Sequence, residues 1–157
     1  MHLKNMAKLI IWIVVFQAIG FLLGLFTQTN IHPWYESLNK SSLTPPGAVF
    51  SIVWTVLYVL LAVIGWTLSG HKNEHHYKSI YYLFAAQMLM NWLWTPLFFQ
   101  LHWLKFSAIW LVSLTVLNWV IMMKVKNKQK GITLLIIPYV LWLIFASYLN
   151  VVIAVMN

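Results

Sequence analysis

The chain has 157 residues, of which 62% are hydrophobic and 8% are charged. This composition argues against a soluble globular protein with a charged shell and indicates an integral membrane protein. Cysteine is absent, which excludes disulfides, thiolate chemistry and cysteine-ligated metals.

Five stretches are long and apolar enough to cross a membrane, for which a helix needs roughly 20 largely apolar residues. They cover approximately residues 9–26, 48–69, 80–100, 106–123 and 132–155. Short polar connections make consecutive helices antiparallel neighbours. We predict an all-α fold in which residues 1–157 form a single domain, an integral membrane bundle of five transmembrane helices.

The first stretch follows two lysines, as the apolar part of a signal peptide would. It is longer than such a segment and lacks a small-residue cleavage site, so we expect it to remain as a helix. Gly20 and Gly24 form a GxxxG pattern, which permits close helix–helix approach.

Lysine placement predicts the orientation in the membrane. All ten basic residues are lysines, the only acidic residues are Glu36 and Glu74, and the formal net charge is +8. With five spans, only Lys40 and Lys105 lie on the far side, so the positive-inside rule puts the N-terminus in the cytoplasm and the C-terminus outside. The lysine run at residues 124–130 favours binding to anionic headgroups over nucleic acid.

The second helix is predicted to begin at Pro45 and Pro46, with Thr44 as its N-cap. Aromatic or small residues then recur every four positions, which builds one ridge along the helix. The ridge contains Phe50, Trp54, Tyr58, Ala62 and Trp66. Packing against a neighbouring helix and contact with a ligand both explain it.

The tryptophans fall into two groups. Those near the ends of spans are predicted to be interfacial anchors: Trp12, Trp34, Trp66, Trp103 and Trp119. Trp54, Trp94 and Trp142 lie deeper, where an indole needs either a hydrogen-bond acceptor or a flat ligand.

Polar residues inside the third and fifth helices must face the interior of the bundle. An unpaired amide in hydrocarbon costs several kcal/mol, so Gln87 and Asn91 serve as interhelical contacts, ligand contacts or both. In the last helix, Tyr139, Trp142, Ala146 and Asn150 fall on one side at about 100° per residue. That side is predicted to face a partner or a ligand.

Several classes of chemistry lack their residues. No charged residue lies clearly within a span, which disfavours ion-coupled transport. There is no Ser-His-Asp pattern, phosphate loop or carboxylate pair. His71, Glu74, His75 and His76 have irregular spacing, so no metal site is expected.

Four groups of residues together resemble one membrane protein family. The first loop contributes Trp34, Tyr35, Leu38, Lys40, Pro45, Pro46 and Gly47; the second helix contributes Phe50, Val53, Trp54, Leu57 and Tyr58; the third contributes Gln87, Asn91, Trp94, Pro96, Phe98 and Phe99; the fifth contributes Pro138, Tyr139, Trp142, Phe145, Ala146, Tyr148, Leu149 and Asn150. They resemble the translocator protein family, also called tryptophan-rich sensory proteins or peripheral benzodiazepine receptors, and the chain resembles a bacterial member.

The resemblance implies a homodimeric five-helix protein of the bacterial cell membrane, with a ligand pocket under the first loop. It implies ligands such as protoporphyrin IX, haem or drug-like aromatic molecules, and no required cofactor. By similarity, Trp54, Asn91, Trp142 and Ala146 line the pocket. Three further residues lie near its roof or wall: Tyr35, Pro45 and Tyr139.

Two departures from the family pattern affect these expectations. Ser41 and Leu43 stand where the family usually has a proline and an aromatic residue, which predicts a looser loop over the pocket. No basic residue follows Tyr148, so sterol binding is not carried over.

Three functions follow as hypotheses. The first is a membrane sensor or translocator-type protein that binds a porphyrin. The second is light- and oxygen-dependent porphyrin degradation, in which Trp54 and Trp142 would be the catalytic residues. The third is passive transport of a hydrophobic metabolite.

Overall fold

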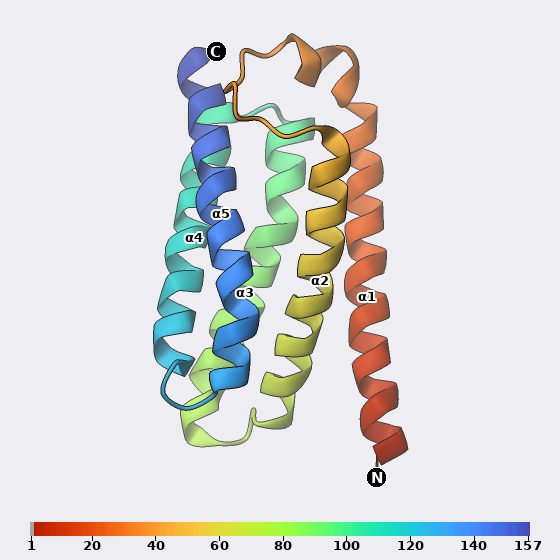
Figure 1. Cartoon of the computed structure of the whole chain (residues 1–157), viewed down its shortest axis with the longest axis vertical. Coiled ribbons are helices and arrows are strands. Elements are labelled where there is room, and N and C mark those ends of the chain that lie inside the picture. The colour runs from red at the N-terminus through yellow and green to blue at the C-terminus, as the bar shows by residue number, and fades with distance from the viewer. Residues whose placement is uncertain (1) are drawn as a thin grey trace.

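A computed structural model describes residues 2–157, and these residues form helices without strands. Five long helices are present: α1 (His2–Thr29), α2 (Gly47–Gly70), α3 (His75–Thr95), α4 (Leu104–Val125) and α5 (Lys130–Met156) (Figure 1). Two short helical turns, η1 (Ile31–Tyr35) and η2 (Pro96–Gln100), follow α1 and α3. The predicted all-helical fold is confirmed.

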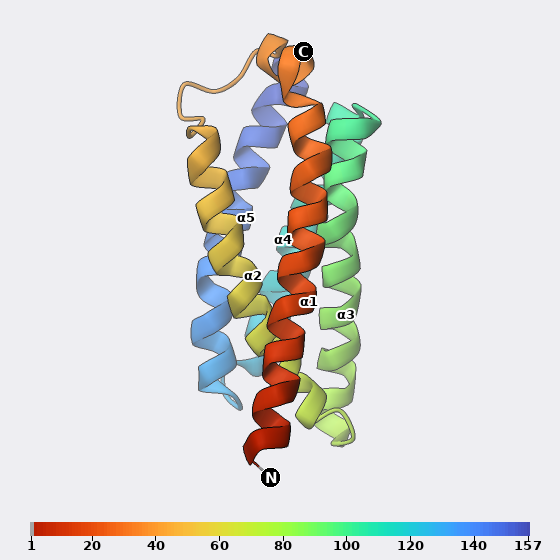
Figure 2. The same ribbon diagram turned by 90° about the vertical axis from the view of Figure 1, so that its right-hand side faces the viewer.

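The helices form a closed ring rather than a row. Each of α1, α2, α5, α4 and α3 packs on the next in that order, and α3 also contacts α1 (Figures 1 and 2). The N-terminus lies at one end of the bundle with the α2–α3 and α4–α5 connections. The C-terminus lies at the other end with the α1–α2 and α3–α4 connections (Figure 1).

The helix ends follow local chemistry more closely than hydropathy. The third helix ends at Thr95, because Pro96 cannot continue the hydrogen-bond ladder, and its last predicted turn is η2 instead. Thr44 is not the N-cap of α2. Its hydroxyl donates to the Ser41 carbonyl at 2.8 Å and closes a turn, while Pro46 takes the N-cap position with ψ 152°.

Four of the long helices within the described chain are both long enough and apolar enough to cross a membrane, and the protein is an integral membrane protein. The exception is α3, which has sufficient length but carries histidines and a lysine in its first turn and the amides Gln87 and Asn91 further along. Both amides are buried in the bundle, so α3 still occupies a place in the ring.

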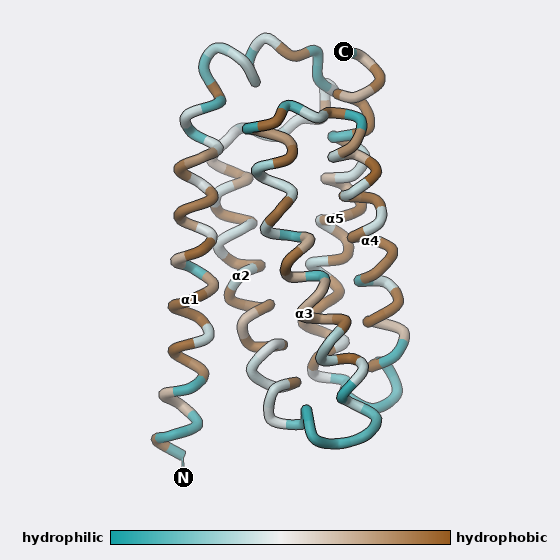
Figure 3. Tube along the Cα trace, turned by 180° about the vertical axis from the view of Figure 1, so that it is seen from behind, coloured by the Kyte–Doolittle hydropathy of each residue, from teal (hydrophilic) through white to brown (hydrophobic). Residues whose placement is uncertain are grey.

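The outer surface suits a bilayer. Large apolar side chains cover the outside of the helices, and α1 contributes a single buried residue, Phe16. Hydrophobic positions dominate the middle of the bundle, and hydrophilic ones gather at the N-terminal end and in the connections (Figure 3). The helix order puts eight of the ten lysines toward the N-terminal end.

Two glycines allow α1 and α2 to pack closely. A Cβ at Gly65 would lie 2.5 Å from the Trp12 ring, and a Cβ at Gly20 would lie 2.6 Å from the Tyr58 ring. Trp12 therefore packs against α2 inside the protein and does not serve as a free interfacial anchor. Of the predicted GxxxG pair, only Gly20 makes a close contact, since no described side chain approaches the Cβ position of Gly24 within 4 Å.

This difference between the two glycines is testable. We expect Gly20→Ala to lower the thermal unfolding midpoint, because the added methyl overlaps the ring of Tyr58. Overpacking of this kind costs about 1–3 kcal/mol. Gly24→Ala is the matched control on the same helix, with no steric cost and a gain of up to about 1 kcal/mol in helix propensity. Equal midpoints for the two variants in detergent would contradict the close packing.

Candidate functional site: an internal aromatic cavity

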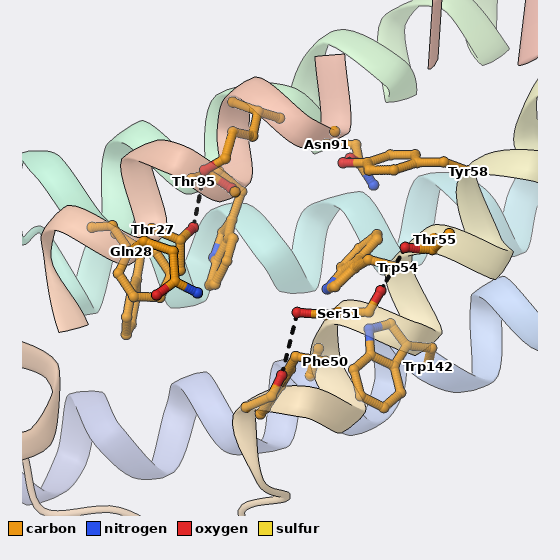
Figure 4. A pocket seen from close by; sticks show the side chains of 18 of the residues that line it. Thr27, Gln28, Phe50, Ser51, Trp54, Thr55, Tyr58, Asn91, Thr95 and Trp142 are labelled. Atoms are coloured by element: carbon orange, nitrogen blue, oxygen red, sulfur yellow. Dashed lines mark hydrogen bonds between the residues drawn. The ribbon is translucent and has the colours of Figure 1, made fainter. Parts of the chain in front are cut away.

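A cavity of about 570 Å³ lies in the half of the bundle nearest the α1–α2 connection. This volume lies within the range of roughly 300–1,000 Å³ found for small-molecule sites. Its walls come from α1, α2, α3 and α5, with Leu111 and Leu114 of α4 behind them. Figure 4 shows Phe50, Trp54 and Trp142 on one side of it and Thr27 and Gln28 on another. Tyr35, Pro45, Phe98 and Phe99 also line it, at the end nearest the α1–α2 and α3–α4 connections.

One wall is a continuous series of aromatic rings. Trp54 lies 5.5 Å from Tyr58 and 6.4 Å from Trp142 between ring centroids, and Trp142 lies 5.6 Å from Phe50. The ridge predicted along α2 therefore serves both of the expected purposes, lining of a cavity and helix packing. Its first three members line the cavity, whereas Ala62 is fully buried in the helix packing below.

A buried hydrogen-bond network forms the floor. The Tyr58 hydroxyl donates to Asn91 Oδ1 at 3.0 Å, and Asn91 Nδ2 donates to the Tyr139 hydroxyl at 2.8 Å. The Tyr139 hydroxyl donates to Gln87 Oε1 at 2.8 Å, which also accepts from Asn118 Nδ2 at 3.0 Å. The network connects α2, α3, α5 and α4, so the floor is fixed from four sides.

The deep tryptophans differ in their hydrogen bonding. Trp94 Nε1 donates to Asn150 Oδ1 at 2.9 Å, which ties α3 to α5 and explains the inward position of Asn150. The Nε1 of Trp142 is buried, and no partner for it occurs among the described residues. Trp92 Nε1 and Gln87 Nε2 are likewise buried without a partner among the described residues, and of these three groups only Trp142 belongs to a residue that lines the cavity.

The segment of residues 36–46, which we call the lid, is held by its own lysine. Lys40 Nζ donates to the carbonyls of Tyr35 at 2.9 Å and Leu38 at 3.0 Å, and it lies 4.7 Å from the centroid of the Tyr35 ring. Burial raises the pKa of the Tyr35 phenol above its ordinary value. Beside the lid, the ring of Trp34 stacks on that of His102, with 3.7 Å between the ring centroids.

The lid is also attached to the end of α5. Ser41 Oγ and Tyr148 Oη lie 2.8 Å apart in a hydrogen bond. Asn157 bonds the backbone of Asn39 twice: Oδ1 accepts from its N–H at 3.1 Å and Nδ2 donates to its carbonyl at 2.9 Å. Ser41 was predicted to loosen the lid because it replaces a proline, yet its side chain supplies one of these attachments.

Six of the seven predicted site residues line this cavity: Tyr35, Pro45, Trp54, Asn91, Trp142 and Ala146. Tyr139 was expected near the roof or wall. It is fully buried one layer behind the lining, where its hydroxyl orients Asn91.

Sequence reasoning missed the contribution of α1 to the lining. Lining residues recur along one side of α1 at Gln17, Gly20, Gly24 and Thr27, and Ile31 of η1 continues the series. The signal was present, because small or polar residues interrupt the apolar run at helical spacing. The sequence prediction covered only Gly20 and Gly24, as a pattern for close helix packing.

The chemistry of the lining is apolar and uncharged. Among the described residues, those that line the cavity include no Asp, Glu, Lys, Arg or His. Polar atoms come from amides, hydroxyls and indoles, and those of Asn91 and Asn150 already have partners. Such a site favours a flat apolar ligand with a hydrogen-bond acceptor over acid–base chemistry performed by side chains.

Comparison with known proteins reveals matches over nearly the whole chain. The TspO/MBR family matches residues 12–156. The tryptophan-rich protein TspO of Archaeoglobus fulgidus is 31% identical over 156 residues, which cover 98% of this chain and 99% of that protein. The protein of the same name from Chlorobaculum tepidum is 30% identical, with 98% of each chain covered. The translocator protein of Bos taurus is 29% identical over 83% of this chain and 79% of its own length.

The role assigned to Tyr139 leads to a stability prediction. We expect Tyr139→Phe to reduce the free energy of unfolding by about 1–2 kcal/mol, because buried Asn91 Nδ2 loses its acceptor and Gln87 Oε1 loses a donor. Tyr82→Phe is the control, since Tyr82 is exposed on the outside of α3. Unfolding in detergent, followed by loss of helical circular dichroism, measures both; equal stabilities would show that the floor network contributes nothing.

Proposed function

Because this chain belongs to the TspO/MBR family, as its loop and helix motifs predicted, we propose that it is a membrane tetrapyrrole-binding protein of the sensor or translocator type. The ligand is a porphyrin such as protoporphyrin IX or haem, held in the internal cavity. No cofactor takes part, and the bound porphyrin is the ligand itself.

The observation that carries the proposal is the aromatic wall with its unused donor. The rings of Phe50, Trp54 and Trp142 offer flat faces and edges to a macrocycle, and each aromatic contact is worth about 0.5–1.5 kcal/mol beyond area burial. The Trp142 N–H supplies one orienting hydrogen bond. A porphyrin is a large flat molecule that can use both.

The absence of charge in the lining constrains how a porphyrin sits. Its propionates are costly to bury without a partner, so they remain at the mouth of the cavity beneath the lid. There they lie beside the polar side chains of Thr27 and Gln28, which line the cavity (Figure 4). The macrocycle occupies the apolar space below.

Lysine placement supports an orientation for this site. We place the lysine-rich N-terminal end of the bundle in the cytoplasm, by the positive-inside rule. The lid and the mouth of the cavity then face the outside.

A second function is favoured by the contact between Trp54 and Trp142. The two rings lie 6.4 Å apart in an edge-to-face arrangement, and a porphyrin bound beside them touches two oxidisable indoles. Light- and oxygen-dependent degradation of the ligand uses that contact. It differs from simple binding in that each chain must convert more than one porphyrin.

Titration with protoporphyrin IX, followed in its Soret band, tests the binding site. We expect saturable binding that Trp142→Phe weakens about three- to tenfold, since it removes the indole face and the N–H donor. Ala146→Leu should weaken binding by more than about tenfold, because the larger side chain occupies the cavity. Trp119→Phe is the matched control, because Trp119 is exposed on the outside of α4.

The same titration under illumination separates the two functions. Saturable binding without loss of the Soret band identifies a binding protein. Protein-dependent bleaching identifies degradation, provided that Trp142→Phe lowers the bleaching rate by a larger factor than it lowers the affinity. Unchanged affinity in both cavity variants would show that the porphyrin does not bind in this cavity.

A further inference from the structure

We infer that ligands reach the cavity sideways from the bilayer, through an opening between α1 and α2, and not through the lid. We call this opening the window; it is bordered by Phe21, Gly24 and Leu25 of α1 and by Gly47 and Ser51 of α2. The inference rests on the proposed function for the identity of the ligand. It concerns a different property, namely the route.

Below the window, α1 and α2 are sealed together. Trp12 fills the space over Gly65, and Tyr58 fills the space over Gly20, each at a distance that leaves no room for a methyl group. Gln17 Nε2 donates to the Thr55 carbonyl at 2.8 Å and joins the helices directly. No ligand can pass between the helices at these levels.

One turn above Gly20 the seal ends. At Gly24 no described side chain lies within 4 Å of the Cβ position, and in Figure 2 the upper part of α2 diverges from α1. Phe21 and Leu25 are 68% and 48% exposed, and both also line the cavity. The same side chains therefore border the cavity and the outer surface, as expected of a lateral opening.

The border of the window suits an apolar ligand arriving from lipid. The Ser51 hydroxyl donates to the Gly47 carbonyl at 3.5 Å, and the Thr55 hydroxyl donates to the Ser51 carbonyl at 2.7 Å (Figure 4). These hydroxyls have their donors satisfied within α2. A flat molecule that passes Ser51 breaks no hydrogen bond between helices, because the interhelical bond from Gln17 to Thr55 lies below the window.

The lid, in contrast, is closed by several contacts. Opening it requires breaking the Ser41–Tyr148 bond and the two bonds between Asn39 and Asn157. Moving the start of the lid also disturbs the stack of Trp34 on His102. The route through the lid is thus obstructed, while the route between the helices is open.

The other edge of α2 offers no equivalent route. A largely apolar groove of about 570 Å³ runs along the outside between α2 and α5, bordered by residues such as Val53, Val56 and Leu141. It ends at Trp142, whose ring is packed between Phe50 and Phe145 at 5.6 Å from each. Trp142 separates this groove from the cavity.

Transfer kinetics from vesicles test the route. The protein is reconstituted in phosphatidylcholine vesicles and mixed with donor vesicles that contain protoporphyrin IX or, in parallel, pyrene, a neutral flat aromatic. Quenching of tryptophan fluorescence reports arrival. We expect Gly24→Leu to slow both association and dissociation by about tenfold with less change in affinity, because it narrows the passage. Phe21→Ala, which widens the window, should accelerate both.

Two controls make the result decisive. Leu22→Ala removes an exposed side chain of α1 outside the window and should leave the rates unchanged. The double variant Tyr148→Phe with Asn157→Ala releases the lid and should also leave them unchanged. Faster exchange in the lid variant, with no effect of Gly24→Leu, would overturn the inference in favour of the lid.

The two probes separate failure of the route from failure of the proposed function. If pyrene follows the expected kinetics and protoporphyrin IX does not bind, the window stands and the porphyrin assignment fails. If protoporphyrin IX binds saturably but its association and dissociation rates are the same in the window variants, the porphyrin assignment stands and the window fails. If neither probe binds, both are wrong, because a cavity supplied from the bilayer must accept an aromatic molecule dissolved in it.

Discussion

The requirement that polar groups in a membrane find partners within the protein determines how this bundle is built. Asn91 meets it through Tyr58 and Tyr139, and the network continues through Gln87 Oε1 to Asn118 Nδ2. Four helices are joined at one level as a result. Gln87 Nε2 and Asn118 Oδ1 have no partner among the described residues. The network excludes a ligand from the lower half of the bundle and leaves the space above it available, so one set of hydrogen bonds both stabilises the ring and sets the depth of the cavity.

The two halves of the bundle therefore differ in their packing. Below the network, glycines allow large rings to enter the helix contacts, as Trp12 does at Gly65. Above it, rings of similar size, such as those of Trp54 and Trp142, line the cavity and do not pack into a neighbouring helix in this way. The transition occurs on α1 between Gly20 and Gly24, within one turn.

Much of this arrangement could be predicted from the sequence, for identifiable reasons. Long apolar runs located α1, α2, α4 and α5, because lipid demands them, and α3 was located although its polar residues make it less apolar than the others. The cost of burying an amide turned Asn91 inward. The partner of Asn91 could not be predicted, since Tyr139 is 48 residues away and a single sequence carries no pairing information. The end of α3 depended on Pro96, and the firmness of the lid depended on Ser41 meeting Tyr148. The Asn91–Tyr139 and Ser41–Tyr148 bonds join distant segments, which periodicity does not report, whereas the end of α3 is a local effect of Pro96 that hydropathy averages away.

The uncharged lining determines how binding must respond to acidity. Among the described residues, the cavity wall includes no side chain that changes its protonation between about pH 5 and 8. The site itself thus has the same electrostatic character across that range. Any dependence of the affinity on pH therefore arises from ionisation of the ligand. Comparing the affinities of a porphyrin and its neutral ester at several pH values measures the contribution of the ligand's carboxylates.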